Sequence, residues 1–394
     1  MARIDSADDT PAAVLLLVDR LRVVQIIPAL AFGGLERVAT TLTVGLEQRV
    51  GRIVVCSSGA AGYVGGAPLD AELRGAGVDV VLVPRPTPGN PARYARSIAA
   101  LARVIKRERP DLVHAHNPGA AAAAAAARAV AGARDTAIVT THHGVKGHRL
   151  RQAVRVLNAS SDLVVGIGPT VTRELRAAGL PDSRSATVFN AIDVHAARPR
   201  DEVRREFDAE DAELVVTVGR YVEEKNQGLL LDATALLRES RPRLRVFVIG
   251  YGRLEGKLRR RVRQLGLGDS ALITGPREDA VSIMAAADVF ALPSAQEGLG
   301  LVALEAMAVG CPVVATAVGG IVDTVRDGRT GLLVRDQGAE AFAAALVRLL
   351  DDENLRQQVA AGGEDLVRRE FSVERMVDGY AEVYERAVRQ RRSN

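Results

Sequence analysis

Short runs of β-branched and other apolar residues alternate along the chain with longer amphipathic or alanine-rich stretches. A strand that is buried on both faces is apolar throughout, whereas a crossover helix repeats every 3.6 residues, so this alternation predicts parallel strands with helices on both sheet faces. In the first half, strands are expected at residues 22–28, 52–57, 78–84, 111–116, 137–141 and 162–167, and helices at residues 35–48, 69–76, 92–108, 119–131, 150–159 and 171–178.

A second series of the same kind follows a polar stretch at residues 198–211, which we interpret as the domain boundary. Its apolar runs are ELVVTVG, LRVFVIG, ALITG, DVFALPS, CPVVAT and GLLV. The predicted fold class is therefore α/β, with two Rossmann-like doubly wound parallel-sheet domains. Ligands of such sheets bind beyond the carboxyl ends of the strands, so the site is expected in the cleft between the domains.

The expected parts of the chain are a tail or extra helix, an N-terminal domain, a C-terminal domain, and a closing helix with its tail. They occupy residues 1–20, 21–197, 198–371 and 372–394, and the basic end after Arg389 is expected to fray.

Composition narrows the function classes. The 394 residues are 47% hydrophobic and carry a net charge of +4, which leaves anionic small molecules, lipid and nucleic acid open. Aromatic residues make up only 3% and tryptophan is absent, so the stacking platforms of a single-strand nucleic-acid binder are scarce. We therefore expect no nucleic-acid partner.

The two cysteines and the N-terminus indicate a cytoplasmic protein. Cys56 and Cys311 each lie in an apolar strand-like run, which is typical of a buried free thiol in a reducing compartment. The apolar stretch at residues 12–18 is too short to span a bilayer, and acidic residues rather than basic ones precede it.

Two glutamates follow the run DVFALPS. Glu297 lies in the loop after this strand, and Glu305 lies in a helix expected from about residue 299 to residue 309. Between them, Gly298, Gly300 and the free N–H groups of the helix start form an anion site, because small residues let a phosphate approach the backbone. Carboxylates at both ends suit hydroxyl groups, although a solvent-exposed helix face could carry the same two residues.

The segment EGLGLVALEAMA resembles the paired-glutamate motif of the retaining GT-B glycosyltransferases of family 4. The resemblance continues through Gly310, Cys311 and Pro312 to Gly319-Gly320, and it extends over about residues 22–389. It implies a GT-B fold in which Glu297 holds sugar hydroxyls and Glu305 holds the ribose of a nucleotide.

Two cations follow the run ELVVTVG. Arg220 and Lys225 lie just past a strand end, where they can neutralise a diphosphate and stabilise it as it leaves, and the family carries Arg and Lys at these positions. Solvated surface charge is the alternative. The following strand ends in Gly250-Tyr251-Gly252, which resembles the family's Gly-x-Gly turn but departs from it at Tyr251 and Arg253.

The N-terminal half contributes glycines and histidines at strand ends. Gly33-Gly34 allow close backbone approach to a phosphate or a sugar. Five of the six histidines fall between residues 114 and 148. The TTHHG run resembles a family element that selects His143 to face the sugar, and His116 resembles the family's other strand-end histidine. A structural role is expected for His142, and no set of ligands with metal-site spacing is present.

An interdomain element is also recognisable by resemblance. Phe189 to Asp193 is similar to the family's Asn-Gly-Ile-Asp segment, with Ala191 in place of glycine, and Gly168 stands where serine is common.

The resemblance implies transfer of a sugar from a nucleoside diphosphate, with UDP or GDP expected, to a hydroxyl acceptor, with retention and without a metal or other cofactor. Consistently, the chain has no Asp-x-Asp triplet. The implied catalytic residues are His143, Arg220, Lys225 and Glu297, and the acceptor or sugar side comprises His116, Asn117 and His143. The implied donor site comprises Gly33, Gly34, Gly219, Arg220, Lys225, Gly275, Arg277, Glu297, Gly298, Leu299, Gly300, Leu301 and Glu305.

Other functions remain open at this stage. A sugar-nucleotide epimerase, a phosphorylase and a two-lobed solute-binding protein share the architecture, whereas a dinucleotide oxidoreductase would need a G-x-G-x-x-G turn that is missing. The sequence does not identify the acceptor: a glycan, a lipid-linked molecule and a small molecule all remain open. Arginines at 96, 103 and 107 and at 149, 151 and 155 can contact an anionic membrane at the inner face, or they are solvated surface.

Overall fold

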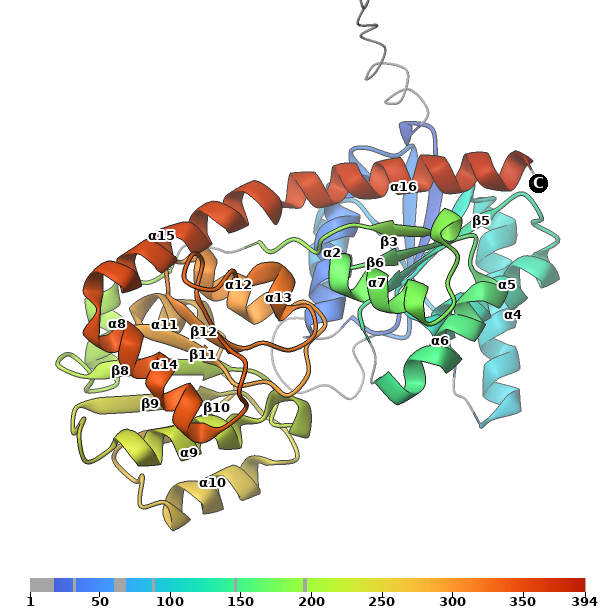
Figure 1. The fold of residues 1–394 in the computed structure, drawn as a ribbon. Coiled ribbons are helices and arrows are strands. Elements are labelled where there is room, and N and C mark those ends of the chain that lie inside the picture. The colour runs from blue at the N-terminus through green and yellow to red at the C-terminus, as the bar shows by residue number, and fades with distance from the viewer. Residues whose placement is uncertain are drawn as a thin grey trace, which may run out of the picture.

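The computed structural model describes residues 18–30, 33–59, 69–86, 89–144, 147–193 and 197–393, and residues 1–17 of the expected tail at residues 1–20 lie outside them. Within these ranges the chain forms two parallel sheets with helices on both faces of each (Figure 1). The predicted α/β class with two Rossmann-like doubly wound sheets is confirmed.

The N-terminal sheet has seven strands among the described residues, in the order β3-β2-β1-β4-β5-β6-β7. The strands are β1 (Arg22–Ile27), β2 (Arg52–Ser57), β3 (Asp79–Leu82), β4 (Leu112–Ala115), β5 (Ala137–His142), β6 (Leu163–Gly166) and β7 (Ser185–Thr187). The connecting helices are α2 (Gly34–Glu47), α3 (Leu69–Gly75), α4 (Pro91–Glu108), α5 (Pro118–Ala131), α6 (Gly147–Ser160) and α7 (Pro169–Ala177). The central strands are buried on both faces because helices cover both, and β1 and β4 contain the buried polar residues Gln25 and His114.

The C-terminal sheet has six strands in the described chain, in the order β10-β9-β8-β11-β12-β13. They are β8 (Glu213–Val218), β9 (Leu244–Ile249), β10 (Ala271–Gly275), β11 (Val289–Leu292), β12 (Val313–Thr316) and β13 (Leu332–Val334). Its helices are α8 (Arg200–Glu206), α9 (Gln227–Leu237), α10 (Glu255–Gln264), α11 (Ala280–Ala286), α12 (Leu301–Ala308), α13 (Ile321–Thr324), α14 (Ala339–Asp351) and α15 (Glu353–Glu370).

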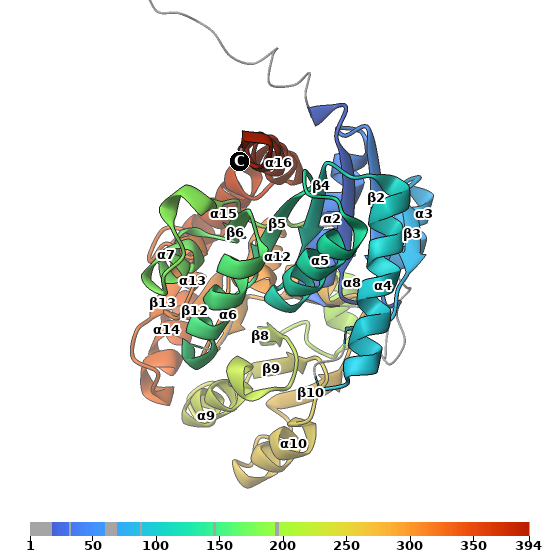
Figure 2. The ribbon, with the colours of Figure 1, turned by 90° about the vertical axis from the view of Figure 1, so that its right-hand side faces the viewer.

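The last helix, α16 (Val373–Ser393), returns to the N-terminal domain and lies along it (Figures 1 and 2). Its apolar side packs into the same hydrophobic cluster as the N-terminal strands, and it adds buried hydrogen bonds. The hydroxyl of Tyr384 lies 2.7 Å from Nδ1 of His114, and the hydroxyl of Tyr380 lies 2.7 Å from Oγ1 of Thr141. The chain therefore crosses between the domains a second time, and this crossing is anchored inside a core.

The stretch interpreted as the domain boundary, residues 198–211, contains α8, whose Arg204 donates to the Asp288 carboxylate. Two local expectations were wrong. Helix α12 begins at Leu301 instead of residue 299, because Gly300 has a left-handed backbone with φ of 76°. The end of α16 is ordered to Ser393, since Arg391 and Arg392 pair with acidic residues of the N-terminal domain.

The domain junction contains a helix cap supplied from the other domain. Helix α7 begins after Gly168, which has no side chain to cap it. Asp323 of α13 takes this role, because its carboxylate accepts from the backbone N–H of Thr170 at 2.9 Å and from the Thr170 hydroxyl at 2.8 Å. The cap holds a helix of the N-terminal domain on the C-terminal domain.

Removing one hydroxyl of α16 should destabilise the N-terminal core. Tyr384→Phe leaves the buried Nδ1 of His114 without its hydrogen-bond partner, so we expect the free energy of unfolding to fall by about 1 to 3 kcal/mol in urea denaturation. Tyr251→Phe is the matched control, because no described group hydrogen-bonds to that hydroxyl. Equal stability of Tyr384→Phe and wild type would contradict the anchoring role.

Candidate active site

The sequence-predicted residues gather where strand order reverses in each sheet. This point lies between β1 and β4 in the N-terminal sheet and between β8 and β11 in the C-terminal sheet. Gly33 and His116 follow β1 and β4, whereas Arg220 and Glu297 follow β8 and β11. The crevice at such a switch point is the usual ligand site of an open parallel sheet.

Lys225 and Glu297 form an ion pair between two strand-end loops of the C-terminal domain. The side chains are 21% and 9% exposed, so the pair is only partly screened by water. Ser294 donates its hydroxyl to the same Glu297 oxygen at 2.8 Å. The backbone also joins the loops, because the N–H of Ala295 donates to the carbonyl of Glu224 at 2.8 Å. The carboxylate and the ammonium therefore hold each other in place.

Glycines let the Glu297 loop approach its neighbours closely. A Cβ on Gly319 would overlap the carbonyl oxygen of Glu297, and a Cβ on Gly320 would overlap that of Gly298. A Cβ on Gly298 would in turn overlap the carbonyl oxygen of His143 in the other domain. The loop is thus packed, without side chains, between its own domain and the histidine loop.

Arg220 rests on the Gly-x-Gly turn after β9. Gly250 and Gly252 have φ values of 149° and 151°, and a Cβ on either would overlap the backbone of the segment from Gly219 to Tyr221. Tyr221 is fully buried beneath this contact and donates its hydroxyl to the carbonyl of Val248 at 2.8 Å. The turn therefore supports the cation loop through backbone contacts, which do not involve the side chain of Tyr251.

Glu305 lies in α12 with its carboxylate at the domain junction. Burial raises its pKa to about 7, although the positive charges of Arg37 and Lys225 lower it. Arg37 belongs to α2 of the N-terminal domain, so the Glu305 carboxylate lies near cations of both domains. Among the described residues, none donates a hydrogen bond to it, which leaves its oxygens available to a ligand.

The paired glycines at the start of α2 contact protein groups. A Cβ on Gly33 would overlap the carboxylate of Glu36, which folds back over the helix start, and a Cβ on Gly34 would lie 3.3 Å from the Leu301 side chain. Burial raises the pKa of Glu36, while a hydrogen bond from its own backbone and the charges of Arg220 and Arg85 lower it. Glu36 therefore lies between a cation of each domain.

Of the strand-end histidines, His116 is buried and His143 is half-buried, and both are neutral. Burial holds the pKa of His116 and of His143 well below its usual value, and the two ring centroids are 6.0 Å apart. The Nε2 atom of His116 lies 2.9 Å from Oε1 of Gln25. Its Nδ1 and the Nε2 of His143 are buried and have no hydrogen-bond partner among the described residues. His142 is also buried, and burial lowers its pKa to about 4.

Other predicted residues have structural partners. Arg277 forms ion pairs with Asp279 and Glu206 at 2.7 Å each and lies over the Phe207 ring, so its charge is engaged within the C-terminal domain. Asn117 caps α5, since its Oδ1 accepts from the N–H of Ala120 at 2.8 Å. Gly275 has a left-handed φ of 80° at the end of β10. Leu299 is buried next to Gly168 at the domain junction.

Sequence reasoning missed several polar groups of the site. Ser294 and Gln25 are single polar residues in apolar runs, and Glu36 is an acidic residue in the first turn of a helix, where such residues are common. Gln25 was the one signal that the sequence offered, because a glutamine inside an apolar strand is expected to be buried and a buried amide needs hydrogen-bond partners. Within the described ranges, no three His, Cys, Asp or Glu side chains could hold a metal ion.

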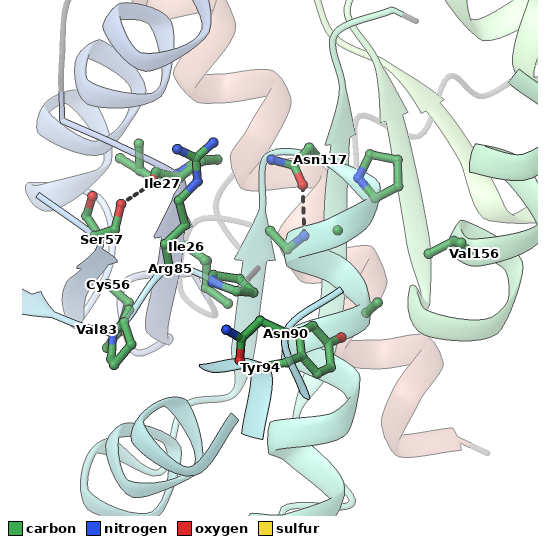
Figure 3. Close-up of a pocket in the computed structure, with 18 of the residues that line it drawn as sticks. Ile26, Ile27, Cys56, Ser57, Val83, Arg85, Asn90, Tyr94, Asn117 and Val156 are labelled. Carbon is green, nitrogen blue, oxygen red and sulfur yellow. Dashed lines mark hydrogen bonds between the residues drawn. The ribbon is translucent and has the colours of Figure 1, made fainter. Parts of the chain in front are cut away.

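A cavity of about 780 Å³ opens beside these residues in the N-terminal domain (Figure 3). It is lined by the ends of β1 and β2, by the segment after β3, and by α4, α5 and α6. Asn117, which directly follows His116, lies in its wall. Cys56 also lines it and, like Cys311, is a buried free thiol, as predicted.

Known proteins resemble the chain in both sequence and fold. Residues 32–196 match the model described as Glycosyltransferase Family 4, and residues 199–365 match Glycosyl transferases group 1. N-acetyl-alpha-D-glucosaminyl L-malate synthase of Bacillus anthracis is 27% identical over 72% of this chain and 77% of its own length. D-inositol 3-phosphate glycosyltransferase of Thermomonospora curvata is 34% identical over 61% of either chain.

Solved structures share the fold. HepE of Anabaena, solved in complex with UDP and glucose, superposes with a TM-score of 0.80 at 21% identity and covers 93% of this chain and 100% of its own. WaaG, a glycosyltransferase involved in lipopolysaccharide biosynthesis, superposes with a TM-score of 0.70 at 20% identity over 92% and 99% of the two chains.

Two parallel-sheet domains with paired glutamates and strand-end cations at their junction define a GT-B glycosyltransferase. Both halves of the chain match glycosyltransferase models in the order that this architecture requires. The protein belongs to glycosyltransferase family 4, as its motifs predicted.

The raised pKa of Glu305 makes stability depend on pH. The folded chain keeps this proton up to about pH 7, whereas the unfolded chain loses it near pH 4.5, so the stabilising effect of the proton is lost as pH rises. Wild type should therefore lose about 2 to 3 kcal/mol of its free energy of unfolding between pH 5 and pH 8 through this group, whereas Glu305→Gln should not. Relative to wild type, the variant should be more stable at pH 8 than at pH 5 by that amount.

Urea denaturation at both pH values measures this difference. Glu382→Gln, at an exposed position of α16, is the control and should show no such difference. A Glu305→Gln effect that is equal at pH 5 and pH 8 would contradict a buried, protonated carboxyl group.

Proposed function

We propose that the protein transfers a sugar from a nucleoside diphosphate sugar to a hydroxyl group, with retention of anomeric configuration and without a metal ion. The observation that carries this proposal is the placement of Arg220 and Lys225 at one strand end beside Glu297 at the neighbouring strand end. A diphosphate needs cations, and a sugar needs carboxylates. HepE, which shares the fold, was solved with UDP and glucose, and this favours UDP as the nucleotide.

The proposed roles follow from position and charge. Lys225 and Arg220 would hold the diphosphate, Glu297 the sugar hydroxyls and Glu305 the ribose hydroxyls, while the turn at Gly275 would border the base through its backbone. Because Lys225 already forms an ion pair with Glu297, a bound diphosphate would interact with a lysine whose charge is partly neutralised by that carboxylate. Arg277 would act indirectly, by bracing the loop that follows Gly275.

Neutral histidines restrict how the leaving group can be stabilised. With pKa values held well below the usual range by burial, His116 and His143 can exchange hydrogen bonds with sugar hydroxyls but carry no positive charge at pH 7. The negative charge that develops on the diphosphate would therefore be met by Arg220 and Lys225. In the family that the chain belongs to, the leaving phosphate is thought to accept the acceptor proton, and we propose the same step here.

Alanine substitutions test the diphosphate assignment. Lys225→Ala and Arg220→Ala should each cost roughly 2 to 4 kcal/mol of transition-state stabilisation, or about 30- to 1000-fold in the rate of UDP release from UDP-glucose. Lys257→Ala and Arg260→Ala, at exposed positions of α10, are matched controls. Turnover near wild type in either site variant would refute the assignment.

The same assay separates the other parts of the proposal. NMR of the product reports the anomeric configuration, and the rate should not change when EDTA is added. Recovery of an epimerised donor, with no transfer to any alcohol, would instead favour the epimerase alternative.

We also propose contact with an anionic membrane through the N-terminal domain. Helices α4 and α6 flank α5 (Figure 2), and they carry exposed arginines at 96, 103 and 107 and at 149, 151 and 155. Within their described bounds these three helices contain one acidic residue, Glu108, which is buried. None of the described helices is long and apolar enough to cross a bilayer.

Vesicle binding tests this contact. Each arginine near an anionic surface contributes about 1 kcal/mol, so changing Arg96, Arg103 and Arg107 together to glutamine should weaken binding to phosphatidylglycerol-containing vesicles roughly 100-fold at low salt. The control replaces Arg259, Arg260 and Arg263 of α10, which are also exposed. Binding that is absent, or that persists unchanged at 0.5 M salt, would remove the proposal.

A further inference from the structure

The cavity beside the active site is lined mainly by apolar groups. Of its described lining residues, five are prolines, and apolar side chains such as Ile27, Val83 and Val156 fill most of the remaining wall. Tyr94 of α4 and Val156 of α6 are labelled in Figure 3. Proline rings hold a wall rigid, and about 780 Å³ is the size of a pocket that encloses a drug-sized molecule.

The polar side chains of the wall are largely used within the protein. Asn90 accepts from the N–H of Arg93 at 3.0 Å, and Asn117 accepts from that of Ala120 at 2.8 Å. The hydroxyl of Ser58 donates to the carbonyl of Pro28 at 2.7 Å. A polyhydroxylated ligand would lose its hydration in this cavity and find few partners to replace it.

The positive charge of the wall is balanced. Arg85 lines the cavity, and its charge acts on the half-buried carboxylate of Glu36. Glu36 is also acted on by Arg220 of the other domain, so this carboxylate connects the cavity with the proposed diphosphate site. An anionic ligand would have to compete with Glu36 for Arg85.

The start of α5 also faces the cavity, but its backbone donors are mostly occupied. Pro118 has no N–H, the N–H of Ala120 donates to the Asn117 side chain, and that of Ala121 donates to the Asn117 carbonyl at 3.0 Å. The N–H of Gly119 is the remaining donor of this first turn. The helix start is therefore a poor anion site, although helix starts usually favour one.

We propose that this cavity binds the acceptor, and that the acceptor is a neutral alcohol with a compact apolar body and not a polyol phosphate or a dicarboxylate. The proposal rests on the proposed function and specifies its substrate class. In the transfer step, the hydroxyl oxygen of the alcohol bonds to the anomeric carbon as the bond from that carbon to the diphosphate oxygen breaks. The hydroxyl proton passes to the leaving phosphate. Glu36 and Arg85 lie where the cavity meets the diphosphate site.

Ligand binding to cavity variants tests the proposal. The probes are 2-naphthol and estradiol, compared with D-inositol 3-phosphate and L-malate, and saturation-transfer NMR with titration measures the Kd of each. Ala122→Trp should fill the cavity, because Ala122 lines it and is half-buried, whereas Ala129→Trp places the same side chain at an exposed position of the same helix. We expect wild type and Ala129→Trp to bind an apolar alcohol, and Ala122→Trp to bind it at least tenfold more weakly.

Gln152→Trp is the second filling variant, since Gln152 is an exposed residue at the cavity wall and tolerates a larger side chain. Binding of D-inositol 3-phosphate or L-malate that Ala122→Trp or Gln152→Trp abolishes would overturn the proposal. Failure of both apolar alcohols to bind, or binding that neither variant changes, would overturn it as well.

A UDP-induced thermal shift, measured in parallel, reports the donor site separately. Retention of this shift in Ala122→Trp shows that the variant is folded and that only the cavity has changed. If wild type shows no shift with UDP, GDP or ADP but binds the alcohol, the donor assignment fails while the cavity assignment stands.

Discussion

Close packing of backbone against backbone at the loop from Glu297 to Gly300 constrains the rest of the site. The loop fits between Gly319-Gly320 of its own domain and the His143 carbonyl of the other, and no Cβ can be accommodated at either contact. The closely packed loop holds the Glu297 carboxylate beside Lys225 and leads directly into α12. The same contact brings the histidine loop next to the carboxylate loop.

Burial then determines the charge states of the site. Desolvation keeps His116 and His143 neutral, so the positively charged side chains of the site are arginine and lysine. Desolvation also raises the pKa values of Glu305 and Glu36. Each of these cations lies near a carboxylate of the protein. The site is consequently close to neutral before any ligand enters, and a ligand must replace existing interactions.

The two domains are connected by more than the interdomain segment. Asp323 of the C-terminal domain caps a helix of the N-terminal domain, and α16 carries the end of the chain back into the N-terminal core through Tyr380 and Tyr384. These contacts are made by buried or half-buried groups with good hydrogen-bond geometry. They hold the two domains together at the junction where the candidate site lies.

The sequence by itself determined the architecture and the family. Strand and helix periodicity predicted both sheets, because covering both faces of a parallel sheet demands continuous apolar strands. Local motifs placed Arg220, Lys225 and Glu297 at strand ends and Glu305 in the helix that follows Glu297. Only the tertiary structure shows which side chains these residues contact. The ion pair of Lys225 with Glu297, the position of Glu36 between two arginines and the engagement of Arg277 join segments far apart in the chain. Local periodicity carries no information on such pairings, since burial and charge at a site depend on everything that the fold packs around it.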